Sequence, residues 1–234
     1  MKLTKNQRRI SNNDTFQKVY PLEEAVQLLK DTAYTKFDSS VDIAVNLALG
    51  AKKVDQGLRG SVVLPYGNGK KLSILALCTP DKEQEAKDAG ATYVGLEEYL
   101  NKIEKGWLDI DAIVTMPSVM PKLGRLGKKL GPRGLMPNPK LGNVTLELGK
   151  EIQAIKNGKI NFRLDKYDIV HASIGRVSFS VEKIAENVRE FMEALVRLKL
   201  STGKPVCIKK VAISTTMGKG IKVRISKSDK QLSS

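Results

Sequence analysis

The spacing of hydrophobic and polar residues changes along the chain, and each spacing predicts a different kind of element. Apolar residues recur at helical spacing from Leu22 to Leu29, just after Pro21, and predict a helix that ends near Tyr34. From residue 41 to residue 50 apolar and polar side chains alternate, which is typical of a strand with one buried face. A second strand is expected over residues 61–64, so this first part is predicted to be a helix and two strands.

The middle of the chain begins after the turn-forming residues 65–69, and its apolar residues follow a different pattern. Residues 72–78 are an apolar run, which is typical of a strand covered on both faces. Residues 130–142 are rich in Gly and Pro, so we expect no regular structure there. The other expected elements are strands at 93–94 and 110–114 and helices at 81–89, 97–105, from Ser118 and at 146–157. Strands that alternate with helices predict a small parallel sheet in a layered α/β domain.

The last third returns to the style of the first part. Its expected elements are strands at 160–164, 169–174, 206–214 and 222–225 and a long helix at 181–200 with one apolar side. Because the two ends share this α+β style, we expect them to form one domain into which the middle is inserted. Glycine-rich stretches at 65–70 and 157–159 supply the two crossings that an insertion needs.

The predicted fold class is therefore α/β (α+β) with two domains. Residues 1–66 and 159–234 are expected to form a discontinuous α+β sandwich domain. Residues 67–158 are expected to form an inserted, Rossmann-like three-layer α/β domain.

Charge narrows the class of partner. The 234 residues include 40 Lys and Arg against 25 Asp and Glu, a formal net charge of +15. Such a surplus repels itself in the compact state, and it suits a polyanion whose phosphates release counterions on binding. A merely basic protein without this partner is the simpler alternative, but the cations are unevenly placed along the chain.

Several function classes find no support in the sequence. No stretch approaches the roughly 18 apolar residues of a membrane span, and the basic N-terminus has no apolar run behind it, so neither a membrane anchor nor a secretory signal is expected. Cys78 and Cys207 lie in apolar runs and are expected to be reduced core residues. Residues 67–71 lack the spacer and the Ser or Thr of a phosphate-binding loop. With a single histidine, His171, we expect no metal site, no cofactor, no small-molecule substrate and no enzyme.

A basic segment over residues 123–142 is the first candidate for chemistry. It has no acidic residue, and its glycines and prolines are expected to fix an irregular backbone. Its candidate phosphate-contacting cations are Arg125, Lys128, Lys129, Arg133 and Lys140. The segment can present amides and cations to phosphate, or it can brace a hinge between the domains, and both interpretations stay open.

Three shorter segments are further candidates for RNA contact. Residues 215–218 (Thr-Thr-Met-Gly) follow a strand, so the backbone there can approach a sugar-phosphate edge, although an ordinary turn has the same composition. Arg163 and Lys166 flank a predicted hairpin turn, where Arg163 can pair with Asp165 as a fork for phosphate or as a weak surface ion pair. Phe37, beside Lys36, is a core plug or an RNA contact, and the plug is the more common role for Phe.

The segments together resemble a known family. Residues 124–140, GRLGKKLGPRGLMPNPK, look like the signature of the ribosomal protein L-one family, the bacterial-type proteins of the large-subunit side stalk. Further matching segments follow in the family's order: YPLEEA at 20–25, KFD at 36–38, RGSVVLP at 59–65, AGA at 89–91, GWLD at 106–109, FRLDK at 162–166 and TTMG at 215–218. The resemblance covers nearly the whole chain, from Tyr20 to Arg224.

The resemblance implies two domains with a hinge and a main RNA surface on the terminal domain. It places large-subunit rRNA contacts at Phe37, Arg163, Asp165, Lys166, Thr216, Met217 and Gly218. Around them we assign Lys36, Arg59, His171 and Thr215 to the same candidate surface. The implied partners are large-subunit rRNA, exit-site tRNA whose release the stalk assists, and the protein's own mRNA as a target of repression.

The resemblance also implies a place for the chain. The expected location is the ribosome of the bacterial cytoplasm, with an organelle ribosome as the open alternative, and the chain is expected to be a monomer off the ribosome. Two departures from the family pattern are Tyr167-Asp168, where a small residue and Gly are usual, and Lys219, where Pro is usual. A general basic nucleic-acid-binding protein is the rival function, although it would call for aromatic stacking platforms and only 5% of the residues are aromatic.

Overall fold

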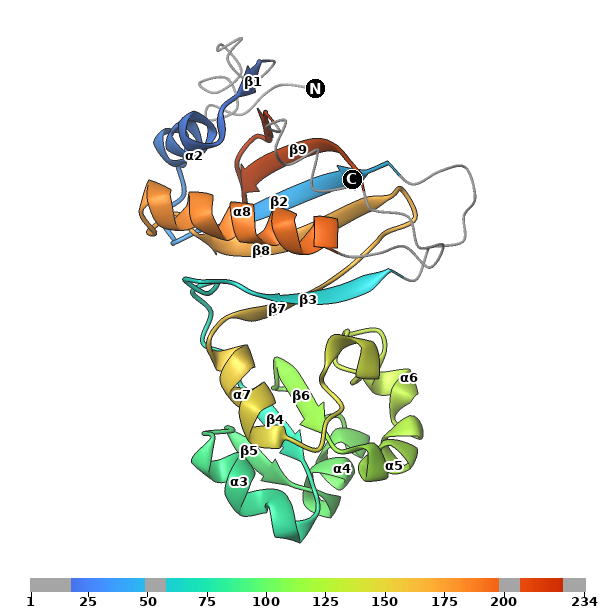
Figure 1. Ribbon diagram of the computed structural model, residues 1–234. Coiled ribbons are helices and arrows are strands. Elements are labelled where there is room, and N and C mark those ends of the chain that lie inside the picture. The colour runs from blue at the N-terminus through green and yellow to red at the C-terminus, as the bar shows by residue number, and fades with distance from the viewer. Residues whose placement is uncertain (1–17, 49–57, 198–206, 225–234) are drawn as a thin grey trace. The chain divides into compact units, whose positions relative to one another are not determined.

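The computed structural model describes residues 18–48, 58–197 and 207–224. The chain divides into two compact units. The terminal unit comprises the chain up to Gly69 and from Ile160 onward, and the inserted unit comprises Lys70–Lys159. Figure 1 labels most of the helices and strands of both units. The domain boundaries expected from the sequence, 1–66 with 159–234 and 67–158, remain a prediction.

A five-stranded sheet forms the centre of the terminal unit. Its strands, in spatial order, are β1 (Val19–Tyr20), β10 (Ile221–Val223), β9 (Ile208–Thr215), β2 (Ser40–Leu47) and β8 (Ile169–Arg176). All neighbours are antiparallel except β1 and β10. Two helices, α2 (Leu22–Asp31) and α8 (Val181–Arg197), belong to this unit. A two-stranded sheet of β3 (Arg59–Val63) and β7 (Lys159–Arg163) also belongs to it, except for Lys159, where the inserted unit ends.

The alternation in β2 determines which side of the sheet forms the core. Every second residue from Val41 to Leu47 is buried, while the residues between them are partly exposed. The buried side chains pack into one cluster with the apolar faces of α2 and α8. Removing each such side chain from water stabilises the fold by about 1.5–3 kcal/mol. The other side of the sheet carries polar and small side chains and is called the open face below.

The inserted unit is a three-layer α/β structure. Its parallel sheet has the order β5 (Tyr93–Gly95), β4 (Ile74–Leu77) and β6 (Ala112–Thr115). Its helices are α3 (Glu83–Asp88), α4 (Glu97–Glu104), α5 (Met120–Gly124), α6 (Gly127–Leu130) and α7 (Leu148–Lys156), with 3₁₀ turns η3 (Pro80–Lys82), η4 (Pro117–Val119) and η5 (Pro139–Leu141).

Strand β4 shows why this sheet needs a layer on each face. Leu75 and Leu77 pack into a cluster with residues of α4 and α5, while Ile74 and Ala76 pack into a second cluster with residues of α3 and α7. The apolar run around this strand therefore faces two cores, as the sequence predicts. Together with the terminal sheet, this arrangement confirms the predicted fold class.

Some expectations from the sequence are wrong. Cys78 is buried, but Cys207 is exposed, because it precedes the first residue of β9 and is not part of the core. The basic segment is not irregular throughout, since α5, α6 and η5 occupy parts of it. Strand β1 is not predicted, because two residues are too few to show a periodicity.

Other expectations lie outside the described residues. They concern the ends of the strand at 41–50 and of the helix at 181–200, the start of the strand at 206–214, the end of the strand at 222–225, and the basic N-terminus. Within the described residues, no helix is long and apolar enough to cross a membrane.

Candidate nucleic-acid interface

The open face of the terminal sheet has a floor of small side chains. In the register, Ala44 lies between Ala212 of β9 and His171 of β8, and Asp42 lies between Ser214 and Ser173. Asp42, Ala44, His171, Ser173 and Ser214 line a shallow depression of about 370 Å³. Exposed lysines on the adjoining strands are Lys209, Lys210 and Lys222. Small side chains with cations around them let a sugar-phosphate backbone approach closely.

A tight turn closes one end of this sheet. Residues 215–218, here called the Met217 turn, are joined by a bond from the Gly218 amide to the Thr215 carbonyl (3.1 Å). The Thr216 amide donates to the Ser40 carbonyl (3.2 Å), and the Ser40 amide donates to the Thr216 hydroxyl (3.1 Å). The turn is thus joined through Thr216 to the first residue of β2.

The Met217 turn also requires glycine at its last position. A Cβ on Gly218 would lie 2.1 Å from the Thr215 hydroxyl oxygen and 3.4 Å from the Thr215 Cβ. Thr215 is buried, at 6% exposure, so its side chain has little room to move. Residues 215–218 therefore form a turn, and the same turn can bring its backbone close to a sugar-phosphate edge. The two interpretations from the sequence are compatible, because Gly218 allows the turn to be this tight.

The loop between α2 and β2 faces the Met217 turn. The Tyr34 hydroxyl donates to the Met217 carbonyl oxygen at 2.8 Å, across 183 residues of sequence. Farther along the loop, the Asp38 carboxylate accepts from the Ser178 amide (3.1 Å) and the Ser178 hydroxyl (2.8 Å). The loop is therefore anchored to the β9–β10 turn and to the turn that follows β8.

Three large side chains of the α2–β2 loop and the Met217 turn are exposed to solvent. Phe37 is 56% exposed, Met217 58% and Tyr34 38%. Of the two interpretations that the sequence leaves open for Phe37, the core plug is wrong, because the loop holds the side chain outside the apolar cluster. Single exposed apolar residues are ordinary, but three on one loop and its bonded turn indicate a surface for a partner.

The β7–β8 hairpin lies at the other end of the sheet. The Asp165 carboxylate accepts from the backbone amides of Tyr167 (2.7 Å) and Ile169 (2.9 Å) and lies 3.6 Å from the His171 Nε2. The amide of Ile169 is the largest cause that holds the pKa of Asp165 below its ordinary value, and the Tyr167 amide and His171 act in the same direction. Desolvation, the second-largest cause, opposes them. Among the described residues, no ion pair joins Arg163 to Asp165, so neither the phosphate fork nor the weak surface ion pair that the sequence left open is formed.

The candidate residues are spread along the sheet rather than gathered at one point. Ser40 and Leu47 are the ends of β2, and at about 3.3 Å per residue they lie roughly 23 Å apart. Lys36, Phe37 and the Met217 turn lie at one end, and the hairpin with Asp165 lies at the other. His171 lies between them on the open face. The arrangement suits an extended partner.

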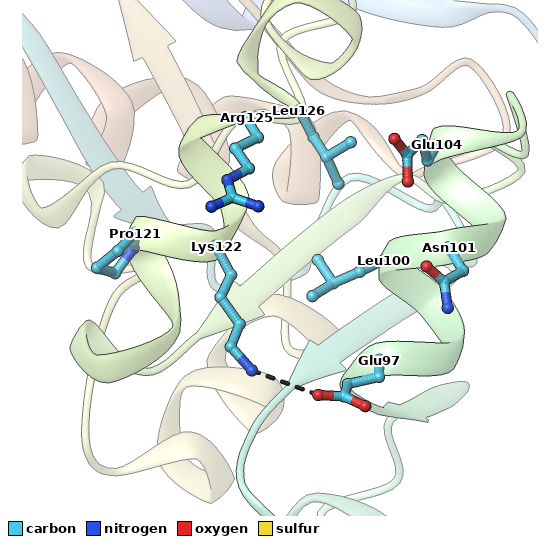
Figure 2. A pocket seen from close by; sticks show the side chains of 8 residues that line it. All are labelled: Glu97, Leu100, Asn101, Glu104, Pro121, Lys122, Arg125 and Leu126. Atoms are coloured by element: carbon cyan, nitrogen blue, oxygen red, sulfur yellow. Dashed lines mark hydrogen bonds and ion pairs between the residues drawn. The ribbon is translucent and has the colours of Figure 1, made fainter.

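The basic segment of the inserted unit is built differently. Figure 2 shows Lys122 of α5 and Arg125, the residue that follows this helix, across a pocket of about 470 Å³ from Glu97 and Glu104 of α4. Lys122 lies 3.5 Å from the Glu97 carboxylate, and Lys129 donates to the Glu104 carbonyl oxygen. Arg125, Lys128, Lys129, Arg133 and Lys140 are all exposed. The Glu97 carboxylate and the Glu104 carbonyl oxygen thus offset part of the positive charge of this segment.

Sequence reasoning missed Tyr34 and Asp38 as contributors to the surface. Nothing in the sequence places Tyr34 beside a turn 183 positions later, and the acidic Asp38 gives no sign that it ties the loop to the turn after β8. In the described part of the chain, no cluster of three or more His, Cys, Asp or Glu side chains could hold a metal ion.

The fold and the surface define a class of protein: a basic two-unit chain whose discontinuous α+β unit presents an open sheet face. Comparison with known proteins makes the class specific. The model of the ribosomal protein L1p/L10e family matches residues 29–219, so the chain belongs to this family. Membership confirms the resemblance seen in the sequence and the expectation that the protein is structural rather than an enzyme.

Individual relatives extend the match to nearly the full length. The chain is 54% identical over 225 residues to a protein of Amoebophilus asiaticus, covering 96% of this chain and 97% of the relative. It is 52% identical over 222 residues to a protein of Phocaeicola vulgatus, covering 95% and 96%, and 53% identical over 222 residues to one of Parabacteroides distasonis, again covering 95% and 96%. Each of these relatives is named large ribosomal subunit protein uL1.

Proposed function

We propose that this chain is a constituent of the large ribosomal subunit and binds folded large-subunit rRNA through its terminal unit. The family membership and the shared name of its relatives support the assignment to the subunit. The net charge of +15 supports a nucleic-acid partner. The ribosomes of the bacterial cytoplasm are the corresponding location.

The observation that carries the proposal is the anchored Met217 turn. Backbone hydrogen bonds and the Tyr34 hydroxyl fix its shape before any RNA arrives. Met217 and Phe37 remain exposed beside it. A preformed surface of backbone and short polar groups suits RNA, which is recognised by shape, by 2′-hydroxyls and by unstacked bases.

Cations around the sheet supply the part of the affinity that depends on salt. We assign this role to Lys36, Arg59, Arg163 and Lys166, all of which are exposed. Each phosphate contact of this kind adds to the slope of affinity against salt concentration. The exposed cations of the inserted unit (Arg125, Lys128, Lys129, Arg133 and Lys140) serve as a secondary, less selective phosphate-contacting surface.

Two finer roles belong to the same proposal. The chain assists the release of deacylated tRNA from the exit site, and it represses translation of its own mRNA. Repression requires the mRNA to offer the terminal unit the same RNA shape as the rRNA. Both roles rest on the resemblance to the family and on the fixed shape of the Met217 turn.

A salt titration with two RNAs of equal length tests the proposal. One is a folded fragment of the rRNA stalk, and the other is an unrelated duplex. We expect tight binding of the stalk fragment to persist at high salt while duplex binding is lost. Equal and steeply salt-dependent binding of both RNAs would instead identify a general basic nucleic-acid-binding protein.

A further inference from the structure

A second cleft of the terminal unit combines an exposed aromatic ring with cations. Leu58, Arg59 and residues 163–167 line this cleft, which has a volume of about 480 Å³. Pockets of this size hold ligands as large as a nucleotide. The Leu164 amide donates to the Leu58 carbonyl oxygen (2.9 Å), so the segments that carry Arg59 and Arg163 run side by side.

Tyr167 is the unusual residue of this cleft. Its side chain is 67% exposed, the largest value among the exposed large hydrophobic residues that the structure describes. Lys166 Nζ lies 5.0 Å from the centre of its ring. A tyrosine that packs so little contributes little to the core, and its ring remains available to a ligand.

The hairpin holds Tyr167 in a defined place. The Asp165 carboxylate accepts from the Tyr167 amide at 2.7 Å, and the next residue, Asp168, is left-handed with φ of 61°. The Asp168 carbonyl accepts from the Leu47 amide at 2.9 Å, which joins the hairpin to the end of β2. The ring is therefore presented by an anchored turn, so little conformational entropy is lost on binding.

The charge around the ring selects the kind of ligand. Arg59, Arg163 and Lys166 line the cleft, and Asp165 is its single acidic lining residue. The Asp165 carboxylate already accepts two amides and faces His171, so it offsets the cations only in part. Two guanidinium groups and an ammonium group suit phosphate, and an exposed ring suits the face of a base.

From this arrangement we infer that the cleft binds one unpaired nucleotide of the RNA partner, with its base stacked on Tyr167 and its phosphate held by Arg59 and Arg163. The inference rests on the proposed RNA-binding function and adds to it a second, stacking contact at the far end of the sheet from the Met217 turn. The base must be unpaired and unstacked, because a ring can stack only on a free base face.

The test compares two exposed tyrosines in the full-length protein. Tyr167→Ala removes the proposed stacking ring, and Tyr167→Phe keeps it. Tyr66→Ala is the matched control, since Tyr66 is 43% exposed and has Lys183 Nζ 5.6 Å from its ring centre. Binding is measured with the folded stalk fragment, with a stem–loop RNA that has an unpaired loop, and with a fully paired duplex of the same length.

We expect Tyr167→Ala to weaken stem–loop binding about tenfold and to leave duplex binding unchanged, because stacking on one base is worth roughly that factor or more. Tyr167→Phe and Tyr66→Ala should stay within about twofold of the unmodified protein. An equal effect of Tyr167→Ala and Tyr66→Ala would overturn the inference. So would a loss in Tyr167→Phe as large as in Tyr167→Ala.

The stalk fragment separates this inference from the proposed function. If the unmodified protein prefers the stalk fragment at high salt but Tyr167→Ala leaves stem–loop binding unchanged, the nucleotide cleft is wrong and the proposed function stands. If the unmodified protein shows no such preference while Tyr167→Ala still weakens stem–loop binding, ribosomal specificity is wrong and the cleft stands.

Discussion

The terminal unit and the inserted unit both present lysines and arginines to solvent, but they hold them in different surroundings. On the terminal unit, the exposed Phe37 and Met217 lie on a loop and a turn that are hydrogen-bonded to each other and to the sheet. On the inserted unit, Lys122 pairs with Glu97 and Lys129 donates to the Glu104 carbonyl oxygen. Local charge alone therefore does not identify a recognition surface; a fixed arrangement of backbone and exposed side chains does.

Deforming the Met217 turn should have the largest effect on the difference between the two units. Gly218→Ala places a Cβ 2.1 Å from the Thr215 hydroxyl oxygen, so the turn must shift. We expect stalk-fragment binding to fall more than tenfold, since a displaced turn loses its contacts as a group, and duplex binding to change little. Gly220→Ala is the control, because no atom lies within 4 Å of its added Cβ. Similar binding by both variants would show that the shape of the turn is unimportant.

Removing the exposed side chains should have the next largest effect. We expect Phe37→Ala and Met217→Ala each to weaken stalk-fragment binding about tenfold, as for the loss of a base-stacking contact. The melting temperature should barely move, because both side chains are more than half exposed. Leu146→Ala, at a 63% exposed position of the inserted unit, is the control and should leave binding intact. A comparable loss of binding in Leu146→Ala would contradict the claim that the exposed apolar side chains of the terminal unit, and not those of the inserted unit, contact the RNA.

The Tyr34 hydroxyl should contribute less. Tyr34→Phe removes the bond to the Met217 carbonyl oxygen and keeps the ring. We expect a loss of two- to tenfold, about the worth of one hydrogen bond, in stalk-fragment affinity. The loss should vanish when Met217 is already Ala, if Tyr34 acts by positioning that residue. Tyr66→Phe, which removes a hydroxyl bonded to Glu186, is the control. Equal losses with and without Met217 would assign Tyr34 a separate contact.

The smallest expected effect concerns pH and stability at the hairpin. Backbone amides lower the pKa of Asp165 below its ordinary value of 3.8. The folded state therefore gains stability from this group above that pH and loses it as pH falls through the lowered pKa. We expect the melting temperature of Asp165→Asn to depend less on pH below about 4 than that of the unmodified protein. Parallel pH profiles of the two proteins would contradict this assignment.

The sequence predicts the fold better than it predicts the surface. The alternation in β2 and the apolar run around β4 each follow from which faces of a strand are covered, and a local pattern records that directly. The surface depends on contacts between distant segments. The bond from Tyr34 to Met217 and the exposure of Phe37 depend on how the loop returns to the sheet.

The same limit explains the hairpin. Sequence proximity suggests that Arg163 pairs with Asp165, yet the carboxylate faces the backbone of its own turn. Short polar side chains often bond to amides two residues onward, and local charge patterns do not reveal that competition. The candidate residues themselves, drawn from motifs and from the family resemblance, remain predictions for the binding experiments.

The most direct test of the central claim compares one set of changes in each unit by salt titration. One variant carries Thr216→Ala and Met217→Ala, and the other carries Arg125→Ala, Lys128→Ala and Arg133→Ala. We predict that the first loses stalk-fragment affinity far more than duplex affinity, with an unchanged salt slope. The second should weaken binding to both RNAs alike and lower the salt slope by about one for each phosphate contact removed. Equal losses on both RNAs for the first variant, or a selective loss for the second, would contradict the claim that the terminal unit carries the specific recognition.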